Sequence, residues 1–217
     1  RTFKEAFQKA VRSLETGRFG LGSDGNREIE SALEALPPGA LDDFLEEAMV
    51  NPRENRVFYI MHALKRVWER ERVCRHTGID PWFIDQLAEL AEAEESFVDS
   101  YRRSGLTPEN VTVMKRLGYS DMQLGVLSDR ENLAVLSRKG PDFQRDYSRA
   151  LKLKEREVRE FRFAHGIVPG YRLVDTCGGE FEAYTPYYYS AYDAEDEAKA
   201  SSGRRVIIIG GGPNRIG

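Results

Sequence analysis

Helix start signals recur along the first two thirds of the chain, and they limit what it can fold into more than any other feature. Asp80-Pro81 and Thr107-Pro108 each place a good N-cap residue before a proline, which is favoured at the first helical position. Three further starts have the capping-box pattern, in which Glu or Gln follows a hydroxyl residue by three positions. These are Thr2-Phe3-Lys4-Glu5, Ser120-Asp121-Met122-Gln123 and Ser128-Asp129-Arg130-Glu131. The sequence therefore predicts a mainly α-helical fold over residues 26–165.

Turn residues separate the predicted helices. Gly17 ends the first helix, and residues 17–26 are rich in Gly, Ser, Asp and Asn, which is typical of a loop. Further helices are predicted over Glu28–Ala35, over Leu41–Met49, over about Glu54–His76 as two helices, and from Pro81 to Ser104. Apolar periodicity predicts the core-facing side of two of them. These core positions are Phe3, Phe7, Ala10 and Leu14 in the first helix, and Phe83, Leu87, Leu90, Ala91, Phe97, Val98 and Tyr101 in the helix from Pro81.

Residues 138–162 are basic. This segment has nine Lys and Arg residues and five Asp and Glu residues, a local charge of +4. Because the net charge of the whole chain is −4, the remaining residues together carry −8. A solvated helix face explains such a stretch. The alternative is a nucleic-acid-binding module, because the spacing over Met122–Leu136 resembles a helix-turn-helix. The net negative charge argues against that alternative, since nucleic-acid-binding domains are usually basic.

Composition restricts the remaining classes of protein. Cys74 and Cys177 are too few for a disulfide framework and are typical of free thiols in a cytosolic protein. No segment approaches the ~20 apolar residues of a membrane helix. We therefore expect a cytoplasmic protein with neither a membrane nor a nucleic acid as its partner.

The helical pattern stops at His165-Gly166. Tyr171–Tyr192 is rich in tyrosine around Pro186, which favours extended chain over helix. Val206–Ile209 is wholly apolar, as in a strand of a parallel α/β sheet, and a glycine-rich turn follows it. Because the sequence starts with Arg1 and ends at Gly217 inside this turn, we expect a piece cut from a longer protein.

The glycine-rich turn is the candidate binding motif with the most specific spacing. Gly212-Pro213-Asn214-Arg215-Ile216-Gly217 matches part of a phosphate-binding loop, and phosphate or nucleotide binding stays open. Arg215 occupies the place of the third glycine of a dinucleotide fingerprint. A strand-to-helix turn that needs small residues explains the motif equally well.

No catalytic, cofactor-binding or metal-ligating residue is predicted elsewhere. His62, His76 and His165 are too far apart in the sequence for a metal motif. Cys74 and His76 are the one near pair, and the adjacent cations Arg72 and Arg75 argue against a bound metal there. The paired carboxylates on predicted helices are expected to face water. They are Glu46-Glu47 and Glu94-Glu95.

Five segments, in this order, resemble one protein family over nearly the whole chain. They are Arg1–Glu15, Ile79–Phe83, Tyr171–Phe181, Tyr188–Tyr192 and Val206–Gly217. Together they resemble the large chain of carbamoyl phosphate synthetase around its helical oligomerisation domain. Two departures stand out: Gly178-Gly179 replaces a pair of alanines, and residues 128–154 are longer than the family pattern.

The resemblance implies a division of the chain into four parts. Residues 1–17 would be the last helix of the first ATP-grasp half, 18–170 the helical oligomerisation domain, and 171–203 an extended connector. Residues 204–217 would be the first strand and turn of the second synthetase half, a truncated α/β domain. By the same resemblance the turn would line a carbamate tunnel. Its residues would be Gly211, Gly212, Pro213, Asn214, Arg215 and Gly217.

The resemblance also implies the activity of a parent protein. That parent would make carbamoyl phosphate from bicarbonate, glutamine-derived ammonia and two ATP, for pyrimidine and arginine synthesis. It would need ATP, Mg²⁺ or Mn²⁺, and K⁺, and it would bind a glutaminase small subunit. The chain of 217 residues would contain no cofactor site and would be inactive by itself. Its own partners would be the flanking ATP-grasp halves and further copies of the chain.

Overall fold

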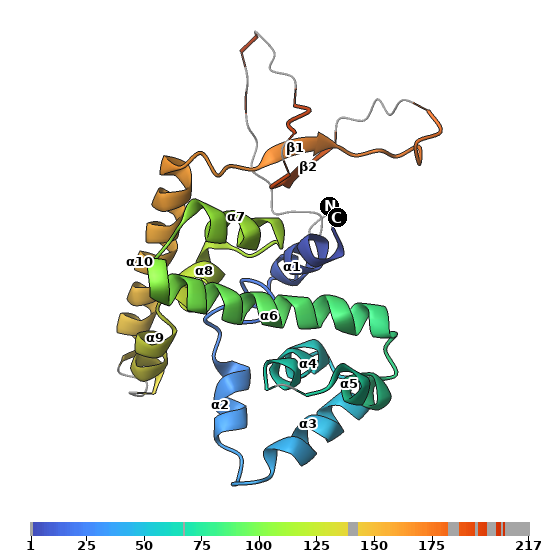
Figure 1. Ribbon diagram of the computed structural model, residues 1–217, viewed down its shortest axis with the longest axis vertical. Helices are drawn as coiled ribbons and strands as arrows, with labels where there is room; N and C mark the ends of the chain where they lie inside the picture. Colours follow the sequence, from blue (N-terminus) through green and yellow to red (C-terminus); the bar gives the residue numbers. More distant parts are fainter. Residues whose placement is uncertain are drawn as a thin grey trace. The chain divides into compact units, whose positions relative to one another are not determined.

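The computed structural model describes residues 2–66, 68–138, 143–181, 187–193, 195–198, 203–204 and 206. They form a helical unit within residues 1–167 and a small β unit within residues 168–217 (Figure 1). The prediction of a mainly α-helical fold is confirmed. The elements are α1 (Phe3–Ser13), α2 (Glu28–Glu34), α3 (Leu41–Val50), α4 (Arg56–Lys65), α5 (Arg70–Thr77), α6 (Pro81–Ser104), α7 (Pro108–Arg116), α8 (Asp121–Ser128), α9 (Arg130–Ser137), α10 (Gln144–Ala164), β1 (Gly170–Leu173) and β2 (Tyr188–Ala191).

Helix α6 is the central element of the helical unit. It spans 24 residues, and α1, α4, α5, α7 and α8 all contact it. Figure 1 shows α1, α7 and α8 on one side of α6 and α3, α4 and α5 on the other. The helix begins as predicted, with Asp80 accepting a hydrogen bond from the Trp82 amide at 2.9 Å and Pro81 at its first position. Most of its predicted core positions are buried, namely Leu87, Leu90, Ala91, Phe97 and Val98.

Three predicted core positions are wrong. Phe83 is 43% exposed and Leu14 is 64% exposed, and Ala10 is exposed as well. Helix α1 instead buries the polar residues Glu5 and Gln8 beside Val11, because part of its inner face meets the backbone of a loop. The apolar face of α1 is left partly exposed.

The capping boxes at Thr107 and Ser120 are present with both reciprocal hydrogen bonds. The box predicted at Ser128 is wrong. Helix α8 runs through Ser128, whose hydroxyl donates back to the Gly125 carbonyl at 2.9 Å. Asp129 is then the N-cap of α9 without a side-chain capping bond, and it is the single residue between the two helices.

Helix α10 covers α8 and α9. It buries Tyr147, Leu151 and Val158 on one face, and the first two complete a small second core with residues of α8 and α9. Residues 121–127 of α8 are all buried. The opposite face of α10 carries the exposed basic residues predicted from the sequence.

The β unit pairs β1 with β2 in antiparallel register, with Arg172 opposite Tyr189. Residues 195–198 are in neither a helix nor a strand. They border β1, where the Glu197 amide donates to the Tyr171 carbonyl at 2.8 Å. Arg172 forms ion pairs with Asp193, Glu195 and Glu197 at 2.9, 3.3 and 3.5 Å. The strand predicted over Val206–Ile209 lies outside the described residues, except for Val206.

Candidate functional site: a buried loop network and an exposed aromatic patch

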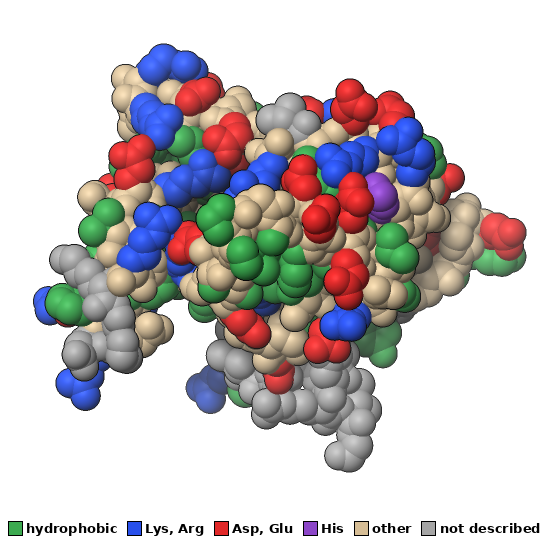
Figure 2. Space-filling model, turned by 90° about the horizontal axis from the view of Figure 1, so that it is seen from below, with side chains coloured by type: hydrophobic (Ala, Val, Ile, Leu, Met, Phe, Trp, Pro, Cys, Tyr) green, Lys and Arg blue, Asp and Glu red, His purple; other side chains and the backbone are tan. Residues whose placement is uncertain are grey.

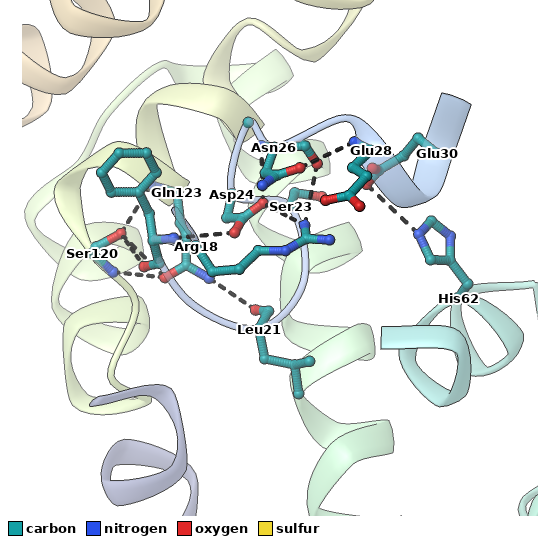
Figure 3. A network of polar contacts seen from close by, with 12 residues as sticks. Arg18, Leu21, Ser23, Asp24, Asn26, Glu28, Glu30, His62, Ser120 and Gln123 are labelled. Carbon is teal, nitrogen blue, oxygen red and sulfur yellow. Dashed lines mark hydrogen bonds and ion pairs between the residues drawn. The ribbon is translucent and has the colours of Figure 1, made fainter. Parts of the chain in front are cut away.

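Residues 17–26 form a loop that side chains of the surrounding helices bind from several directions (Figure 3). We call this loop and the side chains that bind it the loop network. The side chains come from α1, α4, α6 and α8, so four helices meet on ten residues without helix or strand. The helical residues of the network are Gln8, Lys65, Glu94 and Gln123.

Two buried glutamines hold Leu21 of the loop. The Gln8 side chain donates to the Leu21 carbonyl at 3.0 Å and accepts from the Leu21 amide at 2.8 Å. Gln123 also donates to the Leu21 carbonyl, at 2.8 Å. Both glutamines are fully buried. Buried backbone groups need hydrogen-bond partners. The side-chain amides of the two glutamines supply these partners for Leu21, as the backbone of a neighbouring strand would in a sheet.

Glu94 is the second anchor of the loop. It is fully buried and accepts hydrogen bonds from the Ser23 amide at 2.9 Å and the Ser23 hydroxyl at 2.8 Å. The Lys65 ammonium lies 2.5 Å from Glu94, and Tyr119 donates to it at 3.4 Å. Glu94 was predicted to face water, and that prediction is wrong. Its charge is kept inside the protein because Lys65 and three donors surround it.

Asp24 closes the loop on itself. Its carboxylate accepts from the amides of Phe19 at 3.1 Å and Asn26 at 3.0 Å, and lies 3.3 Å from the Arg18 guanidinium. Burial raises the pKa of Asp24 to about 6, although Arg18 and the two amides act in the opposite direction. Arg18 also stacks over the Phe58 ring at 4.2 Å. The loop therefore has an internal ion pair as well as external anchors.

A second buried ion pair fixes the end of α7 to α8 and α10. Lys115 donates to Asp121 at 2.8 Å, and Arg162 donates to the other carboxylate oxygen at 2.8 Å. Burial opposes the charged state of Asp121, but Lys115 and Arg162 outweigh it and lower the pKa of this carboxyl. Burial lowers the pKa of Lys115 to about 8, against the opposite effect of Asp121. Lys115, Asp121 and Arg162 thus join the consecutive helices α7 and α8 to α10, which lies about forty positions further along the chain.

The chemistry of both networks is structural. Each buried carboxylate faces a cation, and the remaining donors point at backbone carbonyls, so the groups hold chain segments together. Among the described residues, no group of three or more His, Cys, Asp or Glu side chains could hold a metal ion. His62 lies 3.6 Å from Glu30, and His76 lies 3.5 Å from Glu46. None of the described helices is long and apolar enough to cross a membrane.

An exposed aromatic patch lies where α1 meets the start of α6. We define it as Phe3, Phe7, Trp82 and Phe83. The Phe3 ring centroid is 5.4 Å from that of Phe7, 5.3 Å from Trp82 and 5.5 Å from Phe83, and Trp82 is 5.0 Å from Phe83. Trp82 is 51% exposed. Aromatic residues that are clustered yet half exposed are typical of a surface that another protein covers.

A family model described as carbamoyl-phosphate synthetase large chain, oligomerisation domain, matches residues 1–141. The chain belongs to this family. The match covers the loop network, the aromatic patch and helices α1 to α9. It ends just before α10.

Curated relatives are similar over the whole chain. A carbamoyl phosphate synthase large chain from Nostoc sp. is 41% identical over 217 residues, which are 100% of this chain and 17% of that protein. One from Archaeoglobus fulgidus is 40% identical over 220 residues, with the same coverage. An arginine-specific large chain from the chloroplast of Arabidopsis thaliana is 36% identical, and 16% of it is covered. The chain thus spans about a sixth of the length of these relatives.

The residues proposed for the tunnel, Gly211–Gly217, lie outside the described residues. The helix-turn-helix alternative does not fit the geometry of the helices concerned. A helix-turn-helix needs a turn of three or four residues and an exposed recognition helix. Here a single residue, Asp129, joins α8 to α9, which is too short for that turn, although α9, in the place of the recognition helix, buries only Leu133.

The loop network was missed at the level of the sequence, although one signal for it is present. Leu87, Leu90, Ala91 and Val98 mark the buried face of α6, and Glu94 lies on the same face at helical spacing. A carboxylate within an apolar stripe indicates a buried partner more often than a solvated one. Ser23 and Lys65 could not have been found as its partners, because each lies at least 29 positions away along the chain.

Proposed function

We propose that this chain is the helical domain that joins the two ATP-grasp halves of a carbamoyl phosphate synthetase large chain and brings copies of that chain together. The parent protein would make carbamoyl phosphate from bicarbonate, glutamine-derived ammonia and two ATP in the cytoplasm, with a glutaminase small subunit as partner. Residues 1–17 and 204–217 would continue into the flanking halves. Family membership supports this proposal, and so does the mainly structural chemistry of the buried networks.

The aromatic patch is the observation that carries the association part of the proposal. Trp68 and Phe97 are buried, as expected of core residues, whereas Trp82 and Phe83 remain 51% and 43% exposed. A fully buried aromatic side chain removes roughly 150–250 Å² from water. Covering the exposed halves of these two rings would therefore add about 200 Å² of apolar contact at one place, which a second protein surface can supply.

Light scattering over a concentration series tests this association. We expect reversible self-association below about 100 μM, in the range of weak specific interfaces. Trp82→Asp should weaken it at least about tenfold, which corresponds to about 1.4 kcal/mol. Val113→Asp is the matched control, because Val113 is 55% exposed on α7 outside the patch. The control should leave the association unchanged.

A species that stays monomeric up to about 100 μM would contradict the association and leave the domain as a spacer. The same preparation tests catalysis. With bicarbonate, ammonia and Mg·ATP we expect no carbamoyl phosphate and no ATP hydrolysis. Turnover that co-purifies with the chain would contradict the assignment of the catalytic sites to the flanking halves.

A further inference from the structure

Helix α10 carries a straight basic stripe on the face opposite its buried residues. The stripe consists of Arg145, Arg149, Lys152, Arg156 and Arg159, all of which are exposed. Their spacing of four, three, four and three residues keeps them on one side of a helix. The match to the family model ends at residue 141, so the family description assigns nothing to this stripe.

The first half of the stripe has no counter-charge within the described residues. Arg145, Arg149 and Lys152 form no ion pair or hydrogen bond there, whereas Arg156 and Arg159 lie near Glu160 and Glu155. Like charges four residues apart repel, and cations near the start of a helix oppose its dipole. An acidic surface from outside would find these three cations without an ion-pair partner among the described residues.

The nearby carboxylates of α10 do not neutralise this half. Glu155 pairs with Arg159, and Glu157 pairs with Lys154 at 3.1 Å. Asp146 is exposed and lies next to Arg145 in sequence, which turns it about 100° around the helix from that residue. The basic charge of the stripe thus remains open to solvent.

A complementary surface exists on α3. This helix has four carboxylates and no basic residue. Asp43 and Glu47 are exposed and form no ion pair with any described residue, while Asp42 and Glu46 face Arg72. Asp43 and Glu47 are four residues apart, about 6 Å along the helix. Arg149 and Lys152 are three residues apart, about 4.5 Å along their helix, so the two pairs are close enough in spacing to face each other.

One copy of the chain cannot bring these surfaces together. Helix α3 packs on α4 and α5, α10 packs on α8 and α9, and the two lie at different sides of the helical unit (Figure 1). Seen from below, acidic side chains surround an apolar patch near the middle of the face, and basic side chains, with acidic ones among them, lie toward the left (Figure 2). Because α3 and α10 of one copy cannot contact each other, α3 of a second copy would have to supply the acidic surface.

We propose that the α10 stripe of one copy binds the acidic face of α3 of another, with Arg149 and Lys152 opposite Asp43 and Glu47. This inference rests on the self-association proposed above and adds a second, electrostatic contact to it. In a two-fold dimer the contact would be made twice, because each copy would give its stripe to α3 of the other; in a ring or filament it would be made once with each neighbour. A nucleic acid is the less favourable occupant, because the remainder of the chain carries −8.

A charge-swap experiment tests the contact in the whole chain. Arg149→Glu/Lys152→Glu and Asp43→Lys/Glu47→Lys should each weaken self-association at least about tenfold, measured by sedimentation velocity. An equimolar mixture of the two variants should associate within about threefold of the unaltered chain, because the reversed charges are again complementary. Raising the salt concentration should weaken the unaltered contact. Arg103→Glu, an exposed charge reversal on α6, should have no effect.

The outcomes separate this contact from the aromatic patch. If Trp82→Asp abolishes association while both charge variants associate normally, the patch proposal stands and the α10–α3 contact is wrong. If the variants lose association and their mixture does not restore it, the pairing of these two surfaces is wrong. If Arg149→Glu/Lys152→Glu changes only the binding of duplex DNA, the stripe serves a polyanion and the inference is overturned. Circular dichroism of each variant checks that the helices are retained.

Discussion

Replacing Glu94 by alanine should destabilise the helical unit strongly. The change removes the partner of Lys65, whose side chain is only 15% exposed, and leaves a cation with the Ser23 hydroxyl as its remaining contact. The Ser23 amide and the Tyr119 hydroxyl each lose an acceptor as well. Removing one member of a buried ion pair costs about 3–5 kcal/mol, most of which comes from the uncompensated charge.

The neighbouring residue supplies a matched control. Glu95 pairs with Arg130 at 2.9 Å, but its side chain is 52% exposed. Because exposed ion pairs contribute about 0–1 kcal/mol, Glu95→Ala should cost little. Glu94→Gln keeps the volume and one acceptor, so it should fall between the two, at about 2 kcal/mol. Adjacent glutamates of one helix would then differ by several kcal/mol.

Urea unfolding followed by far-UV circular dichroism measures these differences. The midpoint should fall for Glu94→Ala with an unchanged slope. In a thermal scan, a loss of about 4 kcal/mol corresponds to a Tm lower by about 8–16 °C for a domain of this size. A second variant tests the cause: Lys65→Met added to Glu94→Leu removes both charges and should recover part of the loss. If Glu94→Ala costs no more than Glu95→Ala, the loop network does not stabilise the fold.

Three further predictions concern single residues of the same region. Burial raises the pKa of Asp24 from 3.8 to about 6, so between these pH values the folded chain keeps a proton that the unfolded chain has lost. The free energy of unfolding should therefore fall by roughly 3 kcal/mol as the pH rises from about 4 to about 6. Asp24→Asn should remove this part of the pH profile of urea unfolding. Gly118→Ala should lower the Tm by several degrees, because Gly118 has a φ of +92° and a Cβ would lie 2.8 Å from the Glu5 Cα; an unchanged Tm would mean that α1 can move away. Ser120→Ala should cost about 1 kcal/mol in the same assay by removing the N-cap of α8, and a cost near zero would show that Gln123 alone caps this helix.

The helices could be predicted because their start and stop signals are local. Asp80, Thr107 and Ser120 each bind an amide two or three residues away, so the sequence around them contains the whole interaction. Ser128 shows the limit of this reasoning. Its hydroxyl can bond forward as a cap or back to Gly125, and the packing of α8 under α10 decides for the second.

The loop network could not be predicted because its partners are distant in sequence. Ser23 and Glu94 are 71 positions apart, and Leu21 and Gln123 are 102 apart. The sequence predicted a loop at residues 17–26, but it did not indicate which helical side chains bind that loop. The place of the aromatic patch could not be read from helical spacing, because Phe83 has the periodicity of a core residue and is nevertheless 43% exposed.

The anchoring of residues 17–26 has a mechanical consequence. An irregular segment rich in glycine usually acts as a hinge, yet here Gln8, Gln123 and Glu94 clamp it to helices on both of its sides. A displacement of α1 should therefore move α6 and α8 as well, because the loop between them is bound to all three helices. In a large chain where α1 continues into a catalytic half, as we propose, the domain would act as a stiff lever: a tilt of one half would turn the whole helical unit.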